Sequence, residues 1–275
     1  MNQAVQFKIL QRLLKFRNPN HWLRLPEHFS YNQQEYVSAL DYIESLRKHD
    51  IQFTFPGDIN YPRQFYKMKE PPLFFEFIGK PFWKSYDCLA VVGARKIHKL
   101  TESWMQHHLS EFIENQRVCI ISGGAYGVDQ LAHMIALKKS APTVVVVPSG
   151  LVDIYPTTLK EKMNFLDSSL VCYVSEFEID QKLNKSHFYY RNRLISALGD
   201  MVLVTQADIK SGSLLTVHHA LENGKPVLTL PSHPELIGFG GNIKLLQEGA
   251  AVISSSLDLL QLWKAEKRSE QLFLT

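Results

Sequence analysis

Short apolar runs alternate with helical patterns along most of this sequence, from about residue 87 to residue 257. Continuous apolar runs are typical of parallel strands that are buried on both faces, with the intervening helices as their cover. The pattern therefore predicts an α/β fold built on a parallel sheet with helices on both faces. The predicted strands are 88–92, 118–121, 143–147, 170–174, 201–204, 226–230 and 251–253, and the predicted helices are 102–115, 128–138, 190–197, 214–223 and 242–247, with one short helix after residue 257.

The first part of the chain has a different pattern. Apolar residues follow helical spacing at 5–14 and again at 36–46, with Pro19 and Pro26 between the two sets. A turn and a strand at 73–78 then lead into the alternating region. The predicted domains are a small helical N-terminal unit at 1–55 and an α/β domain at 56–275.

Composition argues against a membrane-spanning helix and a signal peptide, but it does not indicate a particular function. No apolar run is long enough for a transmembrane helix, and the N-terminus lacks the apolar core of a signal peptide. Cys88, Cys119 and Cys172 lie far apart in strand-like runs, which is typical of reduced thiols in a core. These features predict a cytoplasmic protein. The net charge of +3 and the pI of about 8.6 permit a polyanionic partner but do not require one.

Candidate chemistry lies where predicted strands end, because ligands of such sheets bind at the carboxyl ends of the strands. The first strand ends in Val92-Gly93-Ala94-Arg95, and a guanidinium there suits either a phosphate or a surface ion pair. The second ends in Ser122-Gly123-Gly124-Ala125-Tyr126-Gly127, directly before a helix. Glycines permit close approach of the backbone, and the helix start supplies free N–H groups. We interpret this loop as an anion cradle rather than a tight turn kept for packing alone.

Two further segments have a related character. His187-Phe188-Tyr189-Tyr190-Arg191-Asn192-Arg193 combines aromatic residues, which can stack bases, with arginines, which can hold phosphates. Phe188 is interpreted as a core residue, and we expect one arginine to reach a ligand while the other forms a structural ion pair. Lys210-Ser211-Gly212-Ser213 follows a later strand and opens a helix. It is either a second anion cradle or a helix cap made by Ser211 or Ser213, and the two are compatible.

Catalytic patterns are weak by comparison. No serine has the Gly-x-Ser-x-Gly surroundings of a nucleophile elbow. His133 lies on an apolar helix face and is interpreted as a buried histidine, while the adjacent His218 and His219 make a poor metal pair. Asp129 and Glu176 have no clear partner for acid–base chemistry. We predict no catalytic residues, no metal and no cofactor.

The motifs also occur together in a characteristic order. Their combination closely resembles the DNA-processing protein A family, also called Smf, over about residues 57–257. The matching motifs are Tyr61-Pro62, Pro71-Pro72-Leu73, Val92-Gly93-Ala94-Arg95, Ser122-Gly123-Gly124-Ala125, Gly127-Val128-Asp129 with His133, Gly150 with Tyr155-Pro156, Ser175-Glu176, Arg191-Asn192-Arg193-Leu194-Ile195-Ser196, Ser211-Gly212-Ser213-Leu214-Leu215-Thr216 and Gly249-Ala250.

The resemblance implies an extended Rossmann-like fold and a non-enzymatic protein that binds and protects single-stranded DNA. It further implies that the protein loads the RecA recombinase in natural transformation and forms homodimers. A lysine after Tyr155-Pro156 binds DNA in relatives, and Lys160 or Lys162 could serve. The residues predicted to bind DNA or phosphate are Arg95, Ser122, Gly123, Gly124, Tyr126, Gly127, Lys160, Arg191, Asn192, Arg193, Lys210, Ser211, Gly212 and Ser213.

The sequence also departs from the family pattern. Tyr126 stands where relatives often carry a basic residue, Phe188-Tyr189-Tyr190 replaces Phe-Pro-x, and Pro231-Ser232-His233-Pro234 replaces Pro-Gly. The winged-helix extension of some relatives is not expected in a sequence that stops at Thr275. An alternative is a nucleotide sensor or a phosphoribohydrolase-like enzyme, although the Pro-Gly-Gly-x-Gly-Thr-x3-Glu signature of those enzymes is missing. A scaffold role for the N-terminal unit is compatible with DNA binding.

Overall fold

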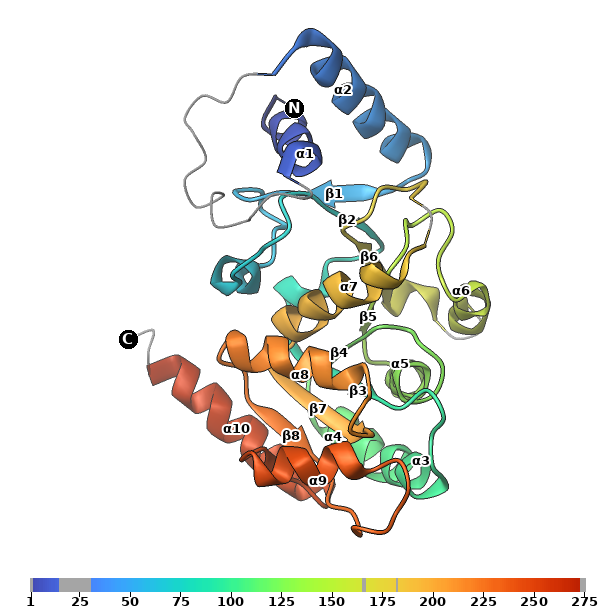
Figure 1. The fold of residues 1–275 in the computed structure, drawn as a ribbon, viewed down its shortest axis with the longest axis vertical. Coiled ribbons are helices and arrows are strands. Elements are labelled where there is room, and N and C mark those ends of the chain that lie inside the picture. The colour runs from blue at the N-terminus through green and yellow to red at the C-terminus, as the bar shows by residue number, and fades with distance from the viewer. Residues whose placement is uncertain (1, 15–30, 165–166, 182, 273–275) are drawn as a thin grey trace.

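A nine-stranded sheet runs through the computed structural model, which describes residues 2–14, 31–164, 167–181 and 183–272. The strand order is β1-β2-β6-β5-β4-β3-β7-β8-β9, and the seven strands from β6 to β9 are parallel to their neighbours. The predicted extended Rossmann-like fold with a helical N-terminal unit is therefore confirmed (Figure 1). The strands are β1 (Gln52–Thr54), β2 (Phe75–Ile78), β3 (Asp87–Gly93), β4 (Val118–Ser122), β5 (Thr143–Val146), β6 (Val171–Ser175), β7 (Met201–Gln206), β8 (Val227–Thr229) and β9 (Ala251–Val252).

Helices cover both faces of the sheet because successive side chains of a buried strand point to opposite sides. Ala90 and Val92 of β3 pack toward the helices α7, α8 and α9, while Leu89 and Val91 pack toward α5, α10 and the α3–α4 segment. The helical elements are α1 (Asn2–Leu14), α2 (Gln33–Lys48), η2 (Arg63–Lys67), η3 (Phe82–Lys84), α3 (Lys99–Trp104), η4 (Met105–Leu109), α4 (Ser110–Asn115), α5 (Val128–Lys138), α6 (Thr157–Asn164), η5 (Ser168–Leu170), α7 (Lys185–Leu198), α8 (Ser213–Glu222), α9 (Gly240–Gln247) and α10 (Ser256–Leu272).

The N-terminal helices pack on the β1 end of the sheet (Figure 1). Their apolar faces share one core with residues of β5 and β6, including Val145 and Tyr173. The strand β1 extends the same sheet by antiparallel pairing with β2. The sheet therefore begins on the N-terminal side of residue 55, and the division at that residue stays a prediction. Pro19 and Pro26 lie outside the described residues.

Three differences from the predicted elements affect the site or its surroundings. The helix α7 begins at Lys185, where the Asn184 side chain accepts a hydrogen bond from the Ser186 amide, so that the aromatic and arginine residues lie inside a helix. The short α6 follows the Tyr155-Pro156 bond, which is cis. The last helix, α10, has 17 residues and is not short, because Leu259 and Trp263 anchor it in the core. Among the described residues, no helix has the length and apolarity needed to cross a membrane.

Candidate functional site at the carboxyl edge of the sheet

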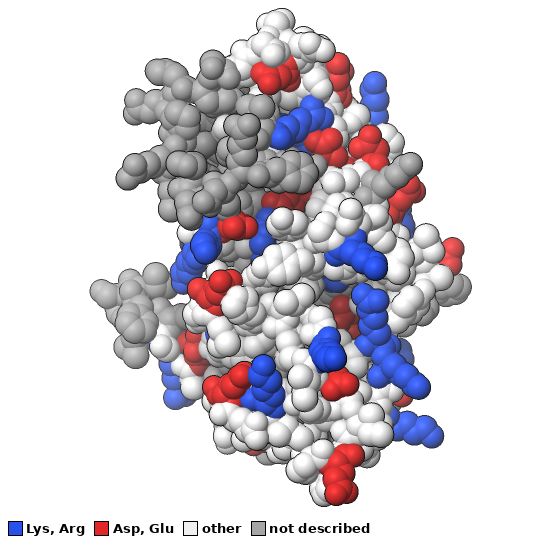
Figure 2. Space-filling view, in the orientation of Figure 1, with Lys and Arg blue, Asp and Glu red and all other residues white. Residues whose placement is uncertain are grey.

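A shallow pocket lies where β3, β4 and β5 end. The residues that line it combine two arginines with aromatic side chains and small backbone elements, and they contain no carboxylate among the described residues. The lining residues are Arg95, Gly123, Ala125, Tyr126, Pro148, Tyr155, Pro156, Phe188 and Arg191. Lys and Arg side chains gather along the right-hand edge of the lower half of the molecule in Figure 2, the side toward which the β7 arrow points in Figure 1. Of the residues predicted to bind DNA, the pocket brings together Arg95, Gly123, Tyr126 and Arg191.

Arg191 forms the inner wall of this pocket. It projects from α7 and is buried, and its Nη1 donates a hydrogen bond to the Val146 carbonyl at 3.2 Å. Burial lowers the pKa of Arg191 to about 10, the buried carboxylate of Asp129 opposes that change, and the charge of Arg95 adds to it. Two guanidinium groups thus act on each other at the pocket, which favours an anion that would contact both.

Gly123 is the residue that makes room for Arg191. A Cβ atom at position 123 would lie 1.2 Å from Nη1 of Arg191 and 2.3 Å from its Cζ. Only a glycine lets the guanidinium lie directly against the backbone of this loop. The close approach of Gly123 is therefore made to the protein's own arginine, which in turn lines the pocket.

Phe188 connects the two arginines. The Cζ atom of Arg95 lies 5.5 Å from the centre of the Phe188 ring, and that of Arg191 lies 5.9 Å from it. Tyr155 meets the same ring edge-on at 6.0 Å. The interpretation of Phe188 as a plain core residue was wrong, because the side chain is only half-buried and lines the pocket. The signal for this role is its spacing: Phe188 precedes Arg191 by three residues, which places both on one face of a helix.

Tyr126 and Gly127 shape the outer side of the pocket. The Tyr126 side chain is 48% exposed, so an aromatic face is open to solvent at the rim. Gly127 has φ +82°, and a Cβ there would lie 2.3 Å from the Ala94 carbonyl oxygen. The loop after β4 therefore packs tightly on the loop after β3 and holds Arg95 at the edge of the pocket.

Comparisons with known proteins identify the family. A family model described as DNA recombination-mediator protein A matches residues 52–264. The chain belongs to this family. The match confirms the resemblance that the order of motifs indicates.

Relatives of the DNA recombination-mediator protein A family cover most of this chain. Protein Smf of Synechocystis is 28% identical over 232 residues, which are 83% of this chain and 58% of that protein. The chain thus spans little more than half the length of that curated relative. The X-ray structure of DNA processing protein A from Streptococcus pneumoniae has a TM-score of 0.74 at 26% identity, covering 94% of this chain and 92% of that one. DNA processing protein A from Helicobacter pylori has a TM-score of 0.68 at 30% identity, covering 78% and 97%.

Several residues that the family motifs assign to binding lie behind the pocket. The Ser122 hydroxyl is fully buried and donates to the Val91 carbonyl at 2.6 Å, which joins β4 to β3. Gly124 is buried beneath Leu159 of α6. Arg193 forms an ion pair with Glu176, as expected for one of the two arginines, and the contact of Arg191 with a ligand stays a prediction. A direct contact of these residues with DNA stays a prediction.

The loop before α8 lies next to the pocket rather than in it. Gly212 occupies the N-cap position of α8, and the Ser211 hydroxyl accepts from the Ser213 amide at 3.3 Å. The Ser213 hydroxyl donates to the Gly93 carbonyl, and the Asn192 amide group donates to the Gly212 carbonyl. These contacts hold the predicted segments 187–193 and 210–213 against the end of β3, which leads into the loop that carries Arg95. The exposed side chains of Lys160 and Lys210 lie outside the pocket lining.

His133 is a structural histidine, as its apolar helix face predicts. The side chain is fully buried, and its Nδ1 lies 2.6 Å from Thr143 Oγ1. The Thr143 hydroxyl itself donates to the Ile120 carbonyl at 2.7 Å, so Nδ1 is the donor toward Thr143. Burial lowers the pKa of His133 to about 3. This histidine is therefore neutral in the folded protein over the physiological range.

The depressed pKa of His133 predicts a loss of stability in acid. In the unfolded chain the His133 ring binds a proton below about pH 6.5, whereas in the folded chain it does so only near pH 3. The contribution of the neutral ring to the unfolding free energy is therefore complete above about pH 6.5 and falls as the pH drops. We expect up to about 1.4 kcal/mol of unfolding free energy to be lost per pH unit in that window. Chemical denaturation between about pH 7 and pH 4.5 measures the effect, and His133→Gln should show a shallower dependence. Parallel curves for the two proteins would contradict this assignment.

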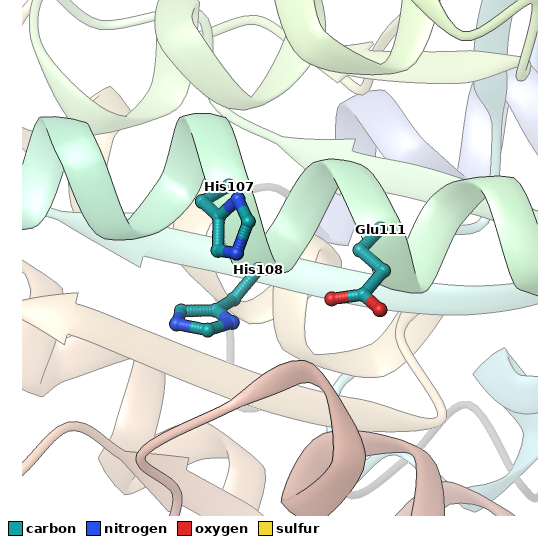
Figure 3. Close-up of side chains that lie close together, drawn as sticks. All are labelled: His107, His108 and Glu111. Carbon is teal, nitrogen blue, oxygen red and sulfur yellow. The ribbon is translucent and has the colours of Figure 1, made fainter.

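One group of side chains elsewhere has the composition of a metal site. Ligand atoms of His107, His108 and Glu111 lie within 4.8 Å of one another on the η4–α4 segment (Figure 3). Glu111 Oε2 already accepts a hydrogen bond from the Ser256 hydroxyl at 2.6 Å, and Trp104 packs beside His108. All three candidates belong to one helical surface and two are exposed, so we assign them no ligand.

Proposed function

We propose that this protein binds single-stranded DNA through the pocket at the carboxyl edge of the sheet. The observation that carries the proposal is the convergence of Arg95 and Arg191 on the Phe188 ring in a pocket without a lining carboxylate. Guanidinium groups can hold phosphate oxygens, and the rings of Phe188 and Tyr126 offer faces against which a base can stack. A single strand presents both groups, whereas a duplex keeps its bases inside.

The two arginines would have different parts in this interaction. Arg191 is fixed by burial and by its bond to Val146, so it provides a charge that needs no ordering when the ligand binds. Arg95 is exposed and stands at the rim, where it would meet the next phosphate along the strand. The similar Helicobacter pylori protein has a single-stranded DNA binding mode, which supports the same ligand for this chain.

Family membership also supports a proposal for the wider role. We propose that the protein acts in the cytoplasm as a homodimer, protects incoming single strands and loads RecA on them during natural transformation and recombination. It would do so without catalysing a reaction. A RecA strand-exchange assay with and without the protein, on DNA coated with a single-strand binding protein, would test the loading step.

Arg95→Ala is the test of the pocket. We expect affinity for single-stranded oligonucleotides to fall about tenfold or more for all sequences alike, since the lost contact is to phosphate. The slope of log affinity against log salt should also fall by about one. Because Arg95 is exposed, the unfolding free energy should change by less than about 0.5 kcal/mol. Fluorescence anisotropy over a salt series measures both binding quantities.

Lys48→Ala is the matched control for Arg95→Ala. Lys48 is an exposed cation at the end of α2, and its removal changes the net charge equally. Affinity and salt slope should both remain close to those of the parent. Equal affinity of Arg95→Ala and the parent would show that the pocket is not the DNA site.

The phosphoribohydrolase alternative has less support from this geometry. Hydrolysis of a glycosidic bond needs a carboxylate at the reacting atoms, and none lines the pocket among the described residues. Asp129 lies behind Arg191, where burial raises its pKa and the arginine charge opposes that change. Incubation with nucleoside monophosphates should therefore release no base, and catalytic release would overturn the binding-only proposal.

A further inference from the structure

A second basic hollow lies at the opposite edge of the sheet, where the parallel strands begin. It is an open hollow whose walls come from η2, η3, the starts of four strands and α10. The residues that line it are Arg63, Gln64, Lys67, Trp83, Lys84, Ser85, Tyr86, Asp87, Arg117, Asp200, Lys225 and Lys267. We refer to it as the amino-edge hollow. The helix α10, which supplies Lys267 to this lining, is labelled in Figure 1.

The amino-edge hollow has a larger excess of positive charge than the whole chain. Its lining holds six cations and two carboxylates, an excess of four positive charges, while the whole chain has a formal net charge of +3. These cations come from segments far apart in the sequence, so tertiary structure gathers them. A concave surface lined by one sign of charge focuses the field into its interior.

Part of this charge is compensated and part is not. Lys267 pairs with Asp200 at 2.7 Å and with Asp87 at 3.1 Å, which binds α10 to the starts of β7 and β3. Among the described residues, by contrast, Arg63, Lys67 and Arg117 form no ion pair with a carboxylate, and all three side chains are exposed.

The lining favours a phosphate backbone over a protein surface. Protein interfaces usually have an apolar centre with a polar rim. None of the lining residues is among the exposed large apolar side chains of the described chain: Trp83 is buried, with its indole N–H bonded to the Asn60 carbonyl, and Tyr86 is covered by the Arg117 guanidinium at 4.8 Å. The available contacts are cations on flexible stems around an open groove, which suit a chain of phosphates.

We propose that the amino-edge hollow is a second contact site for the phosphate backbone of a long DNA single strand. This inference rests on the proposed function, because it supplies a second site for the same ligand. The seven residues of β3 separate the two edges by roughly 20 Å, at about 3.3 Å per residue. A short oligonucleotide would fill the carboxyl-edge pocket alone, and a longer strand would reach both sites.

The double variant Arg63→Gln/Arg117→Gln tests this proposal. On an oligo(dT) of about 40 nucleotides, we expect about tenfold weaker binding and a salt slope reduced by about two. On an oligo(dT) too short to span the roughly 20 Å between the two edges, affinity should stay at the parent value. The control is Lys48→Gln/Lys244→Gln, which removes the same charge from exposed positions on α2 and α9 and should bind both lengths as the parent does.

The outcomes separate this proposal from the proposed function. Parent-like affinity and salt slope of Arg63→Gln/Arg117→Gln on the long oligonucleotide would overturn the second site, as would an equal loss in the Lys48/Lys244 control. Weaker binding of Arg95→Ala on the short oligonucleotide tests the carboxyl-edge pocket independently. If Arg95→Ala has no effect while Arg63→Gln/Arg117→Gln weakens binding to the long strand, the first site fails and the amino-edge hollow stands.

Discussion

Gly123→Ala is expected to damage both the fold and the DNA site, although it adds a single methyl group. The new Cβ would lie 1.2 Å from Arg191 Nη1, so the guanidinium must leave its buried position against the loop. Its bond to Val146 would be lost, and the buried Asp129 would lose the nearby positive charge. Losing this hydrogen bond and leaving a buried carboxylate without its neighbouring cation should together cost about 3 kcal/mol or more. Denaturant unfolding measures this loss, and anisotropy should show affinity for single strands falling at least about tenfold.

A double-mutant cycle isolates the cause of the Gly123→Ala effect. If Gly123 serves only to seat Arg191, adding Gly123→Ala to Arg191→Ala should cost less than about 0.5 kcal/mol further. Gly212→Ala is a matched control for stability, because a Cβ at that position meets open space. A Gly123→Ala cost that is unchanged in the Arg191→Ala background would contradict this explanation.

The core strands were predictable because apolar side chains on both faces of a strand must be buried. Runs such as 118–121 are apolar without interruption, and both faces of β4 must be covered. The helix α5 was predicted with its observed bounds, since a glycine loop and an apolar helical face define its start and its course. The short strand β1 was not predicted, because its three residues become a strand only through pairing with β2. The extent of α10 depends likewise on packing against distant residues.

The sequence predicts where the site lies in the fold, but it does not predict which side chains contact one another there. Arg95 and Gly123 follow strands directly, so the carboxyl edge of the sheet brings them together. The sequence does not show that Gly123 faces Arg191, since that contact joins residues 68 positions apart through the placement of α7. Phe188 was assigned to the core because aromatic residues commonly fill cores. Its three-residue spacing to Arg191 on one helix face is evident only when α7 begins at Lys185 rather than at residue 190.

The attachment of the N-terminal unit depends on a buried charge that no motif indicates. Lys8 of α1 is fully buried, with Nζ 3.5 Å from Glu76 of β2 and 3.4 Å from Glu178. The ammonium lies 3.8 Å from the centre of the Tyr42 ring, and the Tyr42 hydroxyl donates to Glu76 at 2.6 Å. Burial raises the pKa of Glu76 to about 7, and the Lys8 charge opposes that change. Helices α1 and α2 thus meet the sheet at one ionisable cluster.

Lys8→Met is therefore expected to destabilise the protein in a pH-dependent way. Without Lys8, no buried cation among the described residues pairs with ionised Glu76, and the unfolding free energy should fall by about 3 kcal/mol near pH 8. The variant raises the folded-state pKa of Glu76 further above its unfolded value, so the carboxyl group favours folding at low pH and opposes it as the pH rises. The loss measured by denaturant unfolding should accordingly shrink toward about pH 5.

The double variant Lys8→Met/Glu76→Gln identifies the charge as the cause. It removes both the cation and the carboxylate, so most of the stability lost near pH 8 should return. Lys48→Met, at an exposed position on α2, should leave stability within about 0.5 kcal/mol of the parent. Only the charge contribution of Lys8 changes with pH, because Glu76 takes up a proton as the pH falls. If Lys8→Met loses the same unfolding free energy at pH 5 as at pH 8, the packing of the lysine stem attaches α1 to the sheet, and its charge does not.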